Sequence, residues 1–223
     1  MKTLSLYQQL RQDIRQGIWP AGQLMNQQKL SDYYQVSRIP VRDALQQLKA
    51  EGLLVMAGKA SLKVPELSAA EAEELYQIRL ALEPLALERA LPALSFHQLG
   101  RAEDLLQQIE QQQHLSAADR GAMNWQFHAL LYQAGDQSPQ LLQLLHRVHQ
   151  QVERYLGFQE LALNYTDTSA TEHWQLLQLL RDGQSQQALT LLHSHIAQAG
   201  QLLVQHLTAL EQTTTSQQSS PAD

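Results

Sequence analysis

The sequence predicts a mainly α-helical chain, in which a small head of three helices and a two-stranded ribbon precedes an all-α bundle of about six helices. Three observations predict this class. Apolar residues recur at helical spacing over most of the chain, short apolar runs around a glycine follow Gly52, and no β pattern appears between residue 68 and about Leu210. We expect domains at 1–67 and 68–210 and a disordered tail at 211–223, which lacks large apolar residues.

The first helix of the head is expected over Leu4–Gly17, where Leu6, Leu10 and Ile14 recur at helical spacing. The final glycine and the Trp-Pro-Ala-Gly segment behind it end this helix. Two short helical patterns then follow between Leu30 and Gly52, joined by a tight turn. Two helices joined in this way are typical of a helix-turn-helix.

The second of these short helices has the features of a DNA-recognition helix. Ser37 is suited to cap it, Pro40 falls in its first turn, and Gly52 closes it. Arg38 and Arg42 lie one turn apart on the same face, so both can enter a major groove, where arginine suits guanine O6/N7 or a phosphate. The alternative is a pair of solvated arginines on an ordinary helix.

Residues 53–64, LLVMAGKASLKV, read as two short strands around a turn that contains Gly58 and Lys59. A ribbon in this place is a wing, whose lysines can lie along a phosphate backbone or in the minor groove. An ordinary exposed hairpin is the alternative. The fold class is therefore a winged helix-turn-helix followed by a helical bundle.

Charge is divided unevenly along the chain. The net charge is −6, but residues 1–67 hold nine Lys and Arg against five Asp and Glu, and the remainder holds seven against seventeen. A basic head on an acidic body suits a protein that binds phosphates with one end only. The absence of cysteine excludes disulfides and thiolate metal sites. With no run of about 18 apolar residues and no signal-like start, we expect a cytoplasmic protein without a membrane partner.

The second domain is expected to be helical throughout, opened by Ser68 with Glu71 three residues later as a capping box. Proline, glycine and asparagine separate its segments, and Pro84 is expected to kink the first of them. The expected helices are Ala69–Leu91, Ser95–His114, Ala118–Ala134, Pro139–Glu160, Ser169–Arg181 and Ser185–Leu210.

Three histidines on different predicted helices form a candidate metal site. Asn124 and His128 share one helix face, His173 lies on a later helix and His195 on the last. In an antiparallel bundle these side chains can converge, and three imidazoles with an amide oxygen suit zinc, nickel or a similar divalent ion. Chance placement is the alternative in a chain with nine histidines. The other six are expected to be exposed or structural.

Arg79 lies in the mostly apolar segment LYQIRLALEPLALERA, where an unpaired charge would be unfavourable. Two partners are possible. Glu83, four residues later, could form a structural ion pair, or Arg79 could face a cavity and bind the carboxylate of a ligand.

The most specific motif of the chain is PAGQLMNQQKLSDYYQVSRIPVRDALQQLKAEGLL in the head. With this motif, and over roughly Leu4–Leu210, the chain resembles the GntR family of bacterial transcriptional regulators, in the FadR-like subgroup whose C-terminal domain is called FCD. The resemblance implies that Arg38 and Arg42 contact operator DNA, helped by neighbours and by the wing. Those helpers are Ser37, Ile39, Pro40, Gly58 and Lys59. Gln28 departs from the pattern, because some relatives carry a DNA-contacting arginine there; Ala57 departs as well, in place of a histidine or arginine.

The family pattern of the second domain is D-x-x-x-H, then E-H, then a histidine before Ile. It falls on Asn124-Trp-Gln-Phe-His128, Glu172-His173 and His195-Ile196. The resemblance therefore implies a divalent metal, zinc in the first place, with small organic or sugar acids bound beside it and near Arg79. Asparagine replaces the usual aspartate, so we expect a weaker or exchangeable metal.

The function expected from these features is that of a ligand-responsive repressor, active as a homodimer on a pseudo-palindromic operator in double-stranded DNA. Two alternatives stay open. Three histidines and an open position also describe hydrolytic zinc enzymes, although no general base is placed nearby by a motif such as H-E-x-x-H. The metal could also be purely structural, in a regulator with a different signal.

Overall fold

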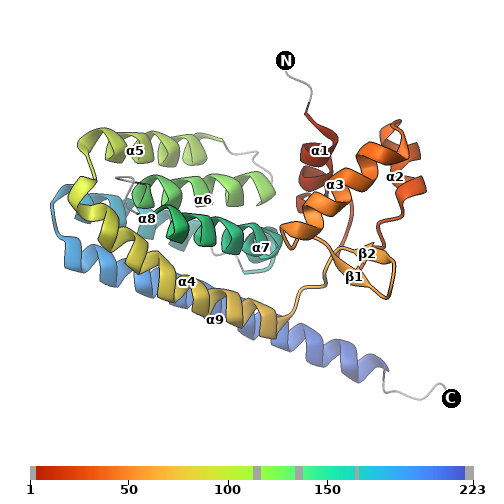
Figure 1. Ribbon diagram of the computed structural model, residues 1–223. Helices are drawn as coiled ribbons and strands as arrows, with labels where there is room; N and C mark the ends of the chain where they lie inside the picture. The colour runs from red at the N-terminus through yellow and green to blue at the C-terminus, as the bar shows by residue number, and fades with distance from the viewer. Residues whose placement is uncertain (1–3, 113–116, 134–137, 164–165, 219–223) are drawn as a thin grey trace. The chain divides into compact units, whose positions relative to one another are not determined.

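The chain divides into two units, Met1–Leu67 and Ser68–Asp223, which are described separately (Figure 1). The computed structural model describes residues 4–112, 117–133, 138–163 and 166–218. Over these residues the first unit has three α-helices and a two-stranded sheet, and the second is helical. The expected fold class, a winged helix-turn-helix followed by a helical bundle, is confirmed. None of the described helices combines the length and the apolar character needed to span a bilayer.

The first unit contains α1 (Leu6–Arg15), α2 (Gln27–Tyr34), α3 (Arg38–Ala50), β1 (Val55–Ala57) and β2 (Ser61–Lys63). Its interior is formed by one apolar face from each helix together with the ends of the ribbon. This burial explains the helical spacing of the apolar residues. The fully or nearly buried members include Leu10, Leu30, Val41, Leu45, Leu48, Leu53 and Leu54.

Local capping accounts for the helix starts in this unit. Ser5 and Gln8 form a reciprocal capping box at α1, and the Asn26 side chain accepts from the Lys29 amide at α2. Ser37 occupies the N-cap position of α3, but its side chain makes no capping hydrogen bond, which corrects the expected role. Pro40, the third residue of α3, has no backbone N–H and so leaves one donor fewer for a capping side chain to satisfy.

The wing is antiparallel, with Met56 opposite Leu62 and Ala57 opposite Ser61. The sequence did not suggest that residues 22–25 would pair with the other edge of β2. There the Met25 amide donates to the Leu62 carbonyl at 2.8 Å, and the Val64 amide donates to the Gln23 carbonyl at 3.0 Å. These bonds fix the wing against the segment that leads into α2.

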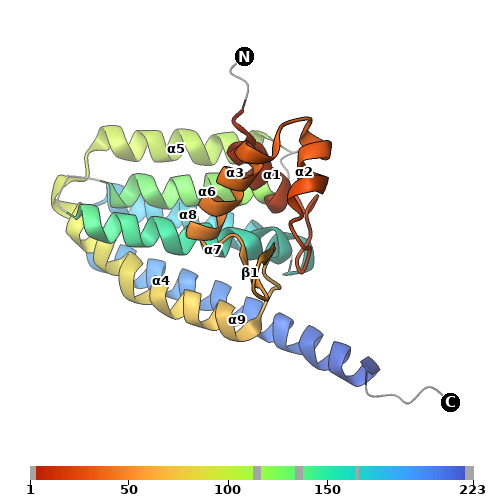
Figure 2. The same ribbon diagram turned by 45° about the vertical axis from the view of Figure 1, so that its right-hand side comes forward.

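The second unit contains six α-helices and the short 3₁₀ helix η1 (Leu91–Ala93) within its described residues (Figure 2). Ser68 accepts from the Glu71 amide, but the Glu71 carboxylate accepts from the Tyr155 hydroxyl instead of completing a capping box. The first helix continues through Pro84. The α-helices are α4 (Ala69–Ala90), α5 (Phe96–Gln111), α6 (Ala117–Tyr132), α7 (Pro139–Leu163), α8 (Thr166–Arg181) and α9 (Ser185–Gln218).

The last helix is longer than expected. α9 continues to Gln218, so disorder from residue 211 is wrong for residues 211–218; residues 219–223 lie outside the described part. Glu211 explains part of this extension, because its Oε1 accepts from the Ala69 amide at 2.9 Å and so satisfies a free donor at the start of α4.

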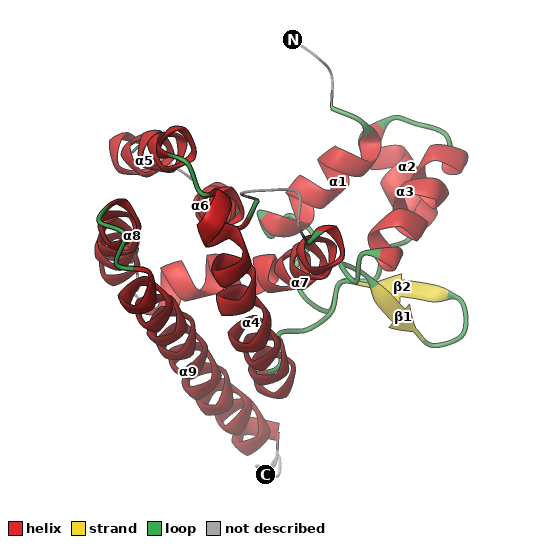
Figure 3. Cartoon of the chain, turned by 60° about the vertical axis from the view of Figure 1, so that its left-hand side comes forward, coloured by secondary structure: helices red, strands yellow, loops and turns green. Residues whose placement is uncertain are grey.

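Helices α4 and α9 pack side by side along the bundle (Figure 3). Gly200 on α9 allows this close approach, because a Cβ at that position would lie 2.7 Å from the Tyr76 ring on α4. Tyr76 in turn lies under the Arg79 guanidinium, with 4.6 Å between the guanidinium carbon and the ring centre. The contact between α4 and α9 therefore holds the Tyr76 ring against which the candidate site residue Arg79 packs.

Candidate functional site

His128, His173 and His195 converge in the interior of the second unit, from α6, α8 and α9. Each of the three is buried, and each offers a ring nitrogen within 4.8 Å of the others. The Nε2 atoms of His128 and His173 are 3.2 Å apart. Two nitrogens bound at about 2.05 Å to a tetrahedral ion lie about 3.3 Å apart, so this spacing fits a shared metal ion.

Asn124 offers a candidate oxygen ligand on the same helix as His128. Oδ1 of Asn124, one turn before His128 on α6, is buried and has no hydrogen-bond partner among the described residues. A buried carbonyl oxygen without a partner is unfavourable unless it binds a cation or accepts a hydrogen bond. Together with the three imidazoles, this amide oxygen would give the mixed nitrogen and oxygen set that suits zinc or nickel.

Hydrogen bonds on the outer side of the rings orient two of these histidines. Nδ1 of His195 lies 2.6 Å from Oε2 of Glu172, and Nδ1 of His128 lies 3.1 Å from the Tyr132 hydroxyl. A ligating histidine usually donates its second ring N–H in this way, which fixes the ring and leaves Nε2 for the metal. The sequence did not predict the contact with Glu172. This residue is adjacent to His173 on α8, and adjacent side chains in a helix point in different directions, so Glu172 was not expected near the three histidines.

Glu83 on α4 connects the histidines to Arg79. Its Oε1 accepts from Arg79 Nε at 2.6 Å and lies 3.0 Å from His149 Nε2. Its Oε2 accepts from the Tyr132 hydroxyl at 2.6 Å, and Tyr132 contacts His128. All five side chains are buried. A continuous polar network therefore runs from Arg79 to a candidate metal ligand.

Burial and charge determine the ionisation of this network. Burial alone would raise the pKa of Glu83, but Arg79 and His149 hold that pKa well below its ordinary value. Burial alone would lower the pKa of Arg79, yet Glu83 raises it above its ordinary value. Burial lowers the pKa of His149 to about 4 and holds the pKa values of His128 and His173 well below the ordinary value. These imidazoles are neutral near pH 7, the state in which imidazole binds metals.

Of the two partners considered for Arg79, the structure contains the ion pair with Glu83. This pair uses Nε of the guanidinium. No hydrogen bond from its Nη groups is seen among the described residues, so they remain available to a second anion. Arg79 is only 3% exposed, which means that such an anion would have to enter the interior of the bundle.

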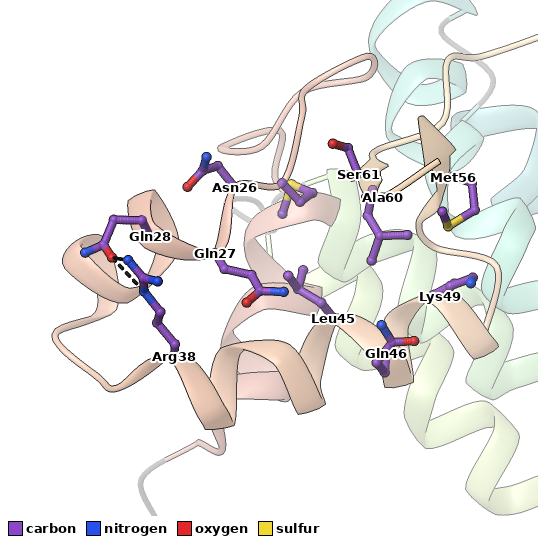
Figure 4. A pocket seen from close by; sticks show the side chains of 12 residues that line it. Asn26, Gln27, Gln28, Arg38, Leu45, Gln46, Lys49, Met56, Ala60 and Ser61 are labelled. Atoms are coloured by element: carbon purple, nitrogen blue, oxygen red, sulfur yellow. Dashed lines mark hydrogen bonds between the residues drawn. The ribbon is translucent and has the colours of Figure 1, made fainter. Parts of the chain in front are cut away.

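The predicted DNA-contacting residues lie together on the surface of the first unit. Arg38, Ile39, Pro40 and Arg42 are exposed on the first turns of α3, and Ser37 immediately precedes them. The turn of the wing, with Gly58 and Lys59, is also exposed. A groove between α2, α3 and the wing includes Arg38 and Lys49 among its lining residues and no acidic residue (Figure 4). Such a face suits a polyanion.

Two family models match the chain and together cover most of it. The model described as "Bacterial regulatory proteins, gntR family" matches residues 2–64, and the FCD domain model matches residues 74–198. The chain belongs to the GntR family and carries an FCD domain. GntR proteins are transcriptional regulators, so the hydrolase alternative is set aside.

Individual relatives agree with this GntR assignment. The chain is 32% identical over 130 residues to an uncharacterized HTH-type transcriptional regulator, YdhC, of Bacillus subtilis (strain 168), an alignment that covers 57% of this chain and 58% of that protein. A GntR family member from Pseudomonas syringae pv. tomato str. DC3000 is 30% identical, with a TM-score of 0.56 and coverage of 92% and 86%. E. coli McbR/YncC shares the fold, with 22% identity, a TM-score of 0.74 and coverage of 92% and 99%.

The polar network of this GntR protein was only partly accessible from its sequence. The three histidines, Asn124 and the pairing of Arg79 with Glu83 were all among the expectations. Tyr132 carried one usable signal, since it lies four residues after His128 and so shares its face. His149 carried none, because its role depends on how α7 packs against α4 and on its stacking 3.6 Å from the Trp125 ring.

Proposed function

We propose that this GntR regulator is a repressor that binds a pseudo-palindromic operator as a homodimer and releases it when a small organic or sugar acid enters the FCD domain. The observation that carries the effector part of this proposal is the convergence of His128, His173 and His195, joined through Glu83 to Arg79. A carboxylate needs positive partners, and this region offers a metal-binding donor set beside a guanidinium.

On the DNA side, Arg38 and Arg42 contact base edges or phosphates at the start of α3. Ser37, Ile39 and Pro40 approach the same groove, and Gly58 and Lys59 bring the wing to the backbone. Their common exposure on one small unit supports this role. Two copies in a homodimer would present two recognition helices to half-sites about one helical turn, or a multiple of it, apart.

On the effector side, Asn124 and the three histidines would hold a divalent ion, zinc in the first place and nickel as the alternative. A bound ion would supply a positive centre for the carboxylate of the acid. The Nη groups of Arg79 would meet a second oxygen of the same ligand, while Nε stays on Glu83. Because Asn124 brings no negative charge, we expect the metal to exchange more readily than with an aspartate ligand.

Coupling to the head would run through α4. This helix carries Arg79 and Glu83 and starts at Ala69, directly after the head in the sequence. A shift of α4 on ligand binding would change the separation of the two recognition helices in a dimer. A rigid dimer tolerates such a shift poorly, so coupling of about 1–3 kcal/mol is enough to weaken operator binding substantially.

The test is a thermal-shift screen of the full chain, metal-loaded and chelated, against a panel of organic and sugar acids. A ligand at 100 times its dissociation constant should stabilise the folded protein by about 2.7 kcal/mol. We expect a hit that requires the metal and is lost in His173→Ala. The matched control is His193→Ala, which removes a histidine outside the converging set on α9.

Two outcomes would oppose the effector proposal. A hit that persists after chelation would place the acid elsewhere. No hit, together with a large loss of melting temperature on chelation alone, would favour a structural metal and a regulator with a different signal.

A further inference from the structure

The DNA-contacting face contains a hydrogen-bond relay that the proposed function does not use. It joins Asp32 and Gln28 on α2 to Arg38 at the first position of α3. Gln28 Nε2 donates to Asp32 Oδ1 at 2.8 Å. Gln28 Oε1 accepts from Arg38 Nε at 2.7 Å and also from Arg38 Nη2 (Figure 4). All three side chains are exposed, and Gln28 and Arg38 line the groove between α2, α3 and the wing.

Asp32 decides which way the Gln28 amide faces. An ionised carboxylate only accepts hydrogen bonds, so the NH₂ end of the amide must point to Asp32. The oxygen end is then turned toward Arg38, where two N–H groups of the guanidinium meet it. Asp32 and Gln28 lie four residues apart on α2, a spacing that brings their side chains together on one face.

The relay also decides which edge of the Arg38 guanidinium is free. Gln28 occupies the edge formed by Nε and Nη2. The opposite edge, formed by Nη1 and the second N–H of Nη2, retains the two parallel donors that pair with guanine O6 and N7. An arginine without such a support can turn toward phosphates as well as bases, and phosphate contacts carry no sequence information.

We propose that Gln28 is a specificity-determining positioning residue, which holds Arg38 in the orientation that reads guanine, with Asp32 fixing the Gln28 amide. Both ends of that amide are engaged within the protein, which favours positioning over direct reading of a base by Gln28. The inference rests on the proposed role of α3 in reading the operator. It adds selectivity for a base to that role.

The experiment uses the full-length protein and a library of random-sequence DNA duplexes, since the operator is unidentified. Selection with wild type and with Arg38→Ala identifies the base pair whose preference depends on Arg38. A bidentate arginine–guanine pair discriminates against a wrong base by about five- to 150-fold. We expect Gln28→Ala to lose about three- to tenfold of the preference at that base pair while keeping most of the non-specific affinity.

Three further variants make the test specific. Gln47→Ala is the matched control, because Gln47 is an exposed glutamine on α3 that does not line this groove, and it should keep the wild-type preference. The double variant Arg38→Ala with Gln28→Ala should match Arg38→Ala alone, because Gln28 acts through Arg38. Gln28→Glu combined with Asp32→Asn preserves both hydrogen bonds and the net charge, so it should restore the preference of the wild type.

The inference would be overturned if Gln28→Ala left the Arg38-dependent base pair unchanged, or changed a different base pair, which would mean that Gln28 reads a base itself. Additive losses in the double variant would contradict it as well. These results leave the DNA-reading role of α3 in place as long as Arg38→Ala alters a base preference. If Arg38→Ala alters none, the placement of α3 and this inference fail together.

Discussion

The Glu172 carboxylate lies 2.6 Å from Nδ1 of His195, and this contact leaves Nε2 as the His195 nitrogen that can bind a metal ion. The amide of Asn124, the candidate oxygen ligand, carries no negative charge. Glu172, through His195, and Glu83, through Tyr132 and His128, would supply negative charge close to an ion held by these residues.

This relationship predicts that Glu172→Gln weakens metal binding. Loss of such an outer partner typically lowers metal affinity about 10- to 100-fold, because the ring is no longer held and its basicity falls. Competition with a chromophoric chelator measures the change. Glu73→Gln removes the same charge from an exposed position on α4 and should have little effect. Equal losses in both variants would assign the effect to net charge instead of the bond to His195.

Substitution at Gly200 should destabilise the second unit. In Gly200→Ala the new Cβ meets the Tyr76 ring at 2.7 Å, and forcing α4 and α9 apart should cost about 1–3 kcal/mol. Gly100→Ala is a matched control, since Gly100 is also helical and a Cβ there has open space. That change should stabilise the helix by up to about 1 kcal/mol. Urea unfolding measures the free energy of unfolding of both variants. A Gly200→Ala protein as stable as wild type would contradict the close packing of α4 and α9.

The buried pair of Arg79 and Glu83 should respond asymmetrically to mutation. Glu83→Gln leaves the buried guanidinium of Arg79 without a counter-ion, and arginine cannot become neutral by losing a proton. The free energy of unfolding should therefore fall by about 3–5 kcal/mol. Arg79→Met should cost less, because His149 can take up a proton and compensate the Glu83 charge. The free energy of unfolding, measured at pH 7 on chelated protein, tests this order. The exposed control Glu88→Gln should stay within about 0.5 kcal/mol of wild type.

Stability of the chelated protein should fall as the pH decreases from about 6.5 to 4. Burial lowers the pKa of His149 from its ordinary 6.5 to about 4, despite the attraction of Glu83; Arg79 and the neighbouring His146 also lower it. The unfolded state therefore binds a proton first, and the folded state loses up to about 3 kcal/mol over this interval. His149→Gln should reduce the slope of the unfolding free energy between pH 6.5 and 4, and the remaining slope is expected from His128 and His173, whose pKa values burial also lowers.

His97→Gln is the control for this pH effect, because His97 is exposed at the start of α5. Its pH profile should follow that of wild type. A profile for His149→Gln as steep as that of wild type would show that other groups produce the acid sensitivity.

Sequence reasoning worked best where local signals and periodicity decide the outcome. The spacing of apolar residues predicts the helices. Asn124 and His128 are four residues apart, as are Arg79 and Glu83, so each pair lies on one helix face. The end of α9 was missed, because a polar sequence at 211–218 carries no apolar signal and the bond from Ala69 to Glu211 joins residues far apart in the chain.

Longer-range features could not be read in the same way. The Glu83 network depends on the rotation of α6 and α7 about their axes, which sets whether Tyr132 and His149 reach the same carboxylate. The bond between Gln28 and Arg38 depends on the angle between α2 and α3. Neither quantity follows from the spacing of residues within one helix.

The most direct test of the central claim is a zinc titration of the chelated full-length protein in competition with a chromophoric chelator. We expect about one zinc ion to bind per chain, with binding lost in His173→Ala and retained in His193→Ala. Zinc binding that is equal in the two variants, or absent from wild type, would contradict the assignment of His128, His173 and His195 as a metal site.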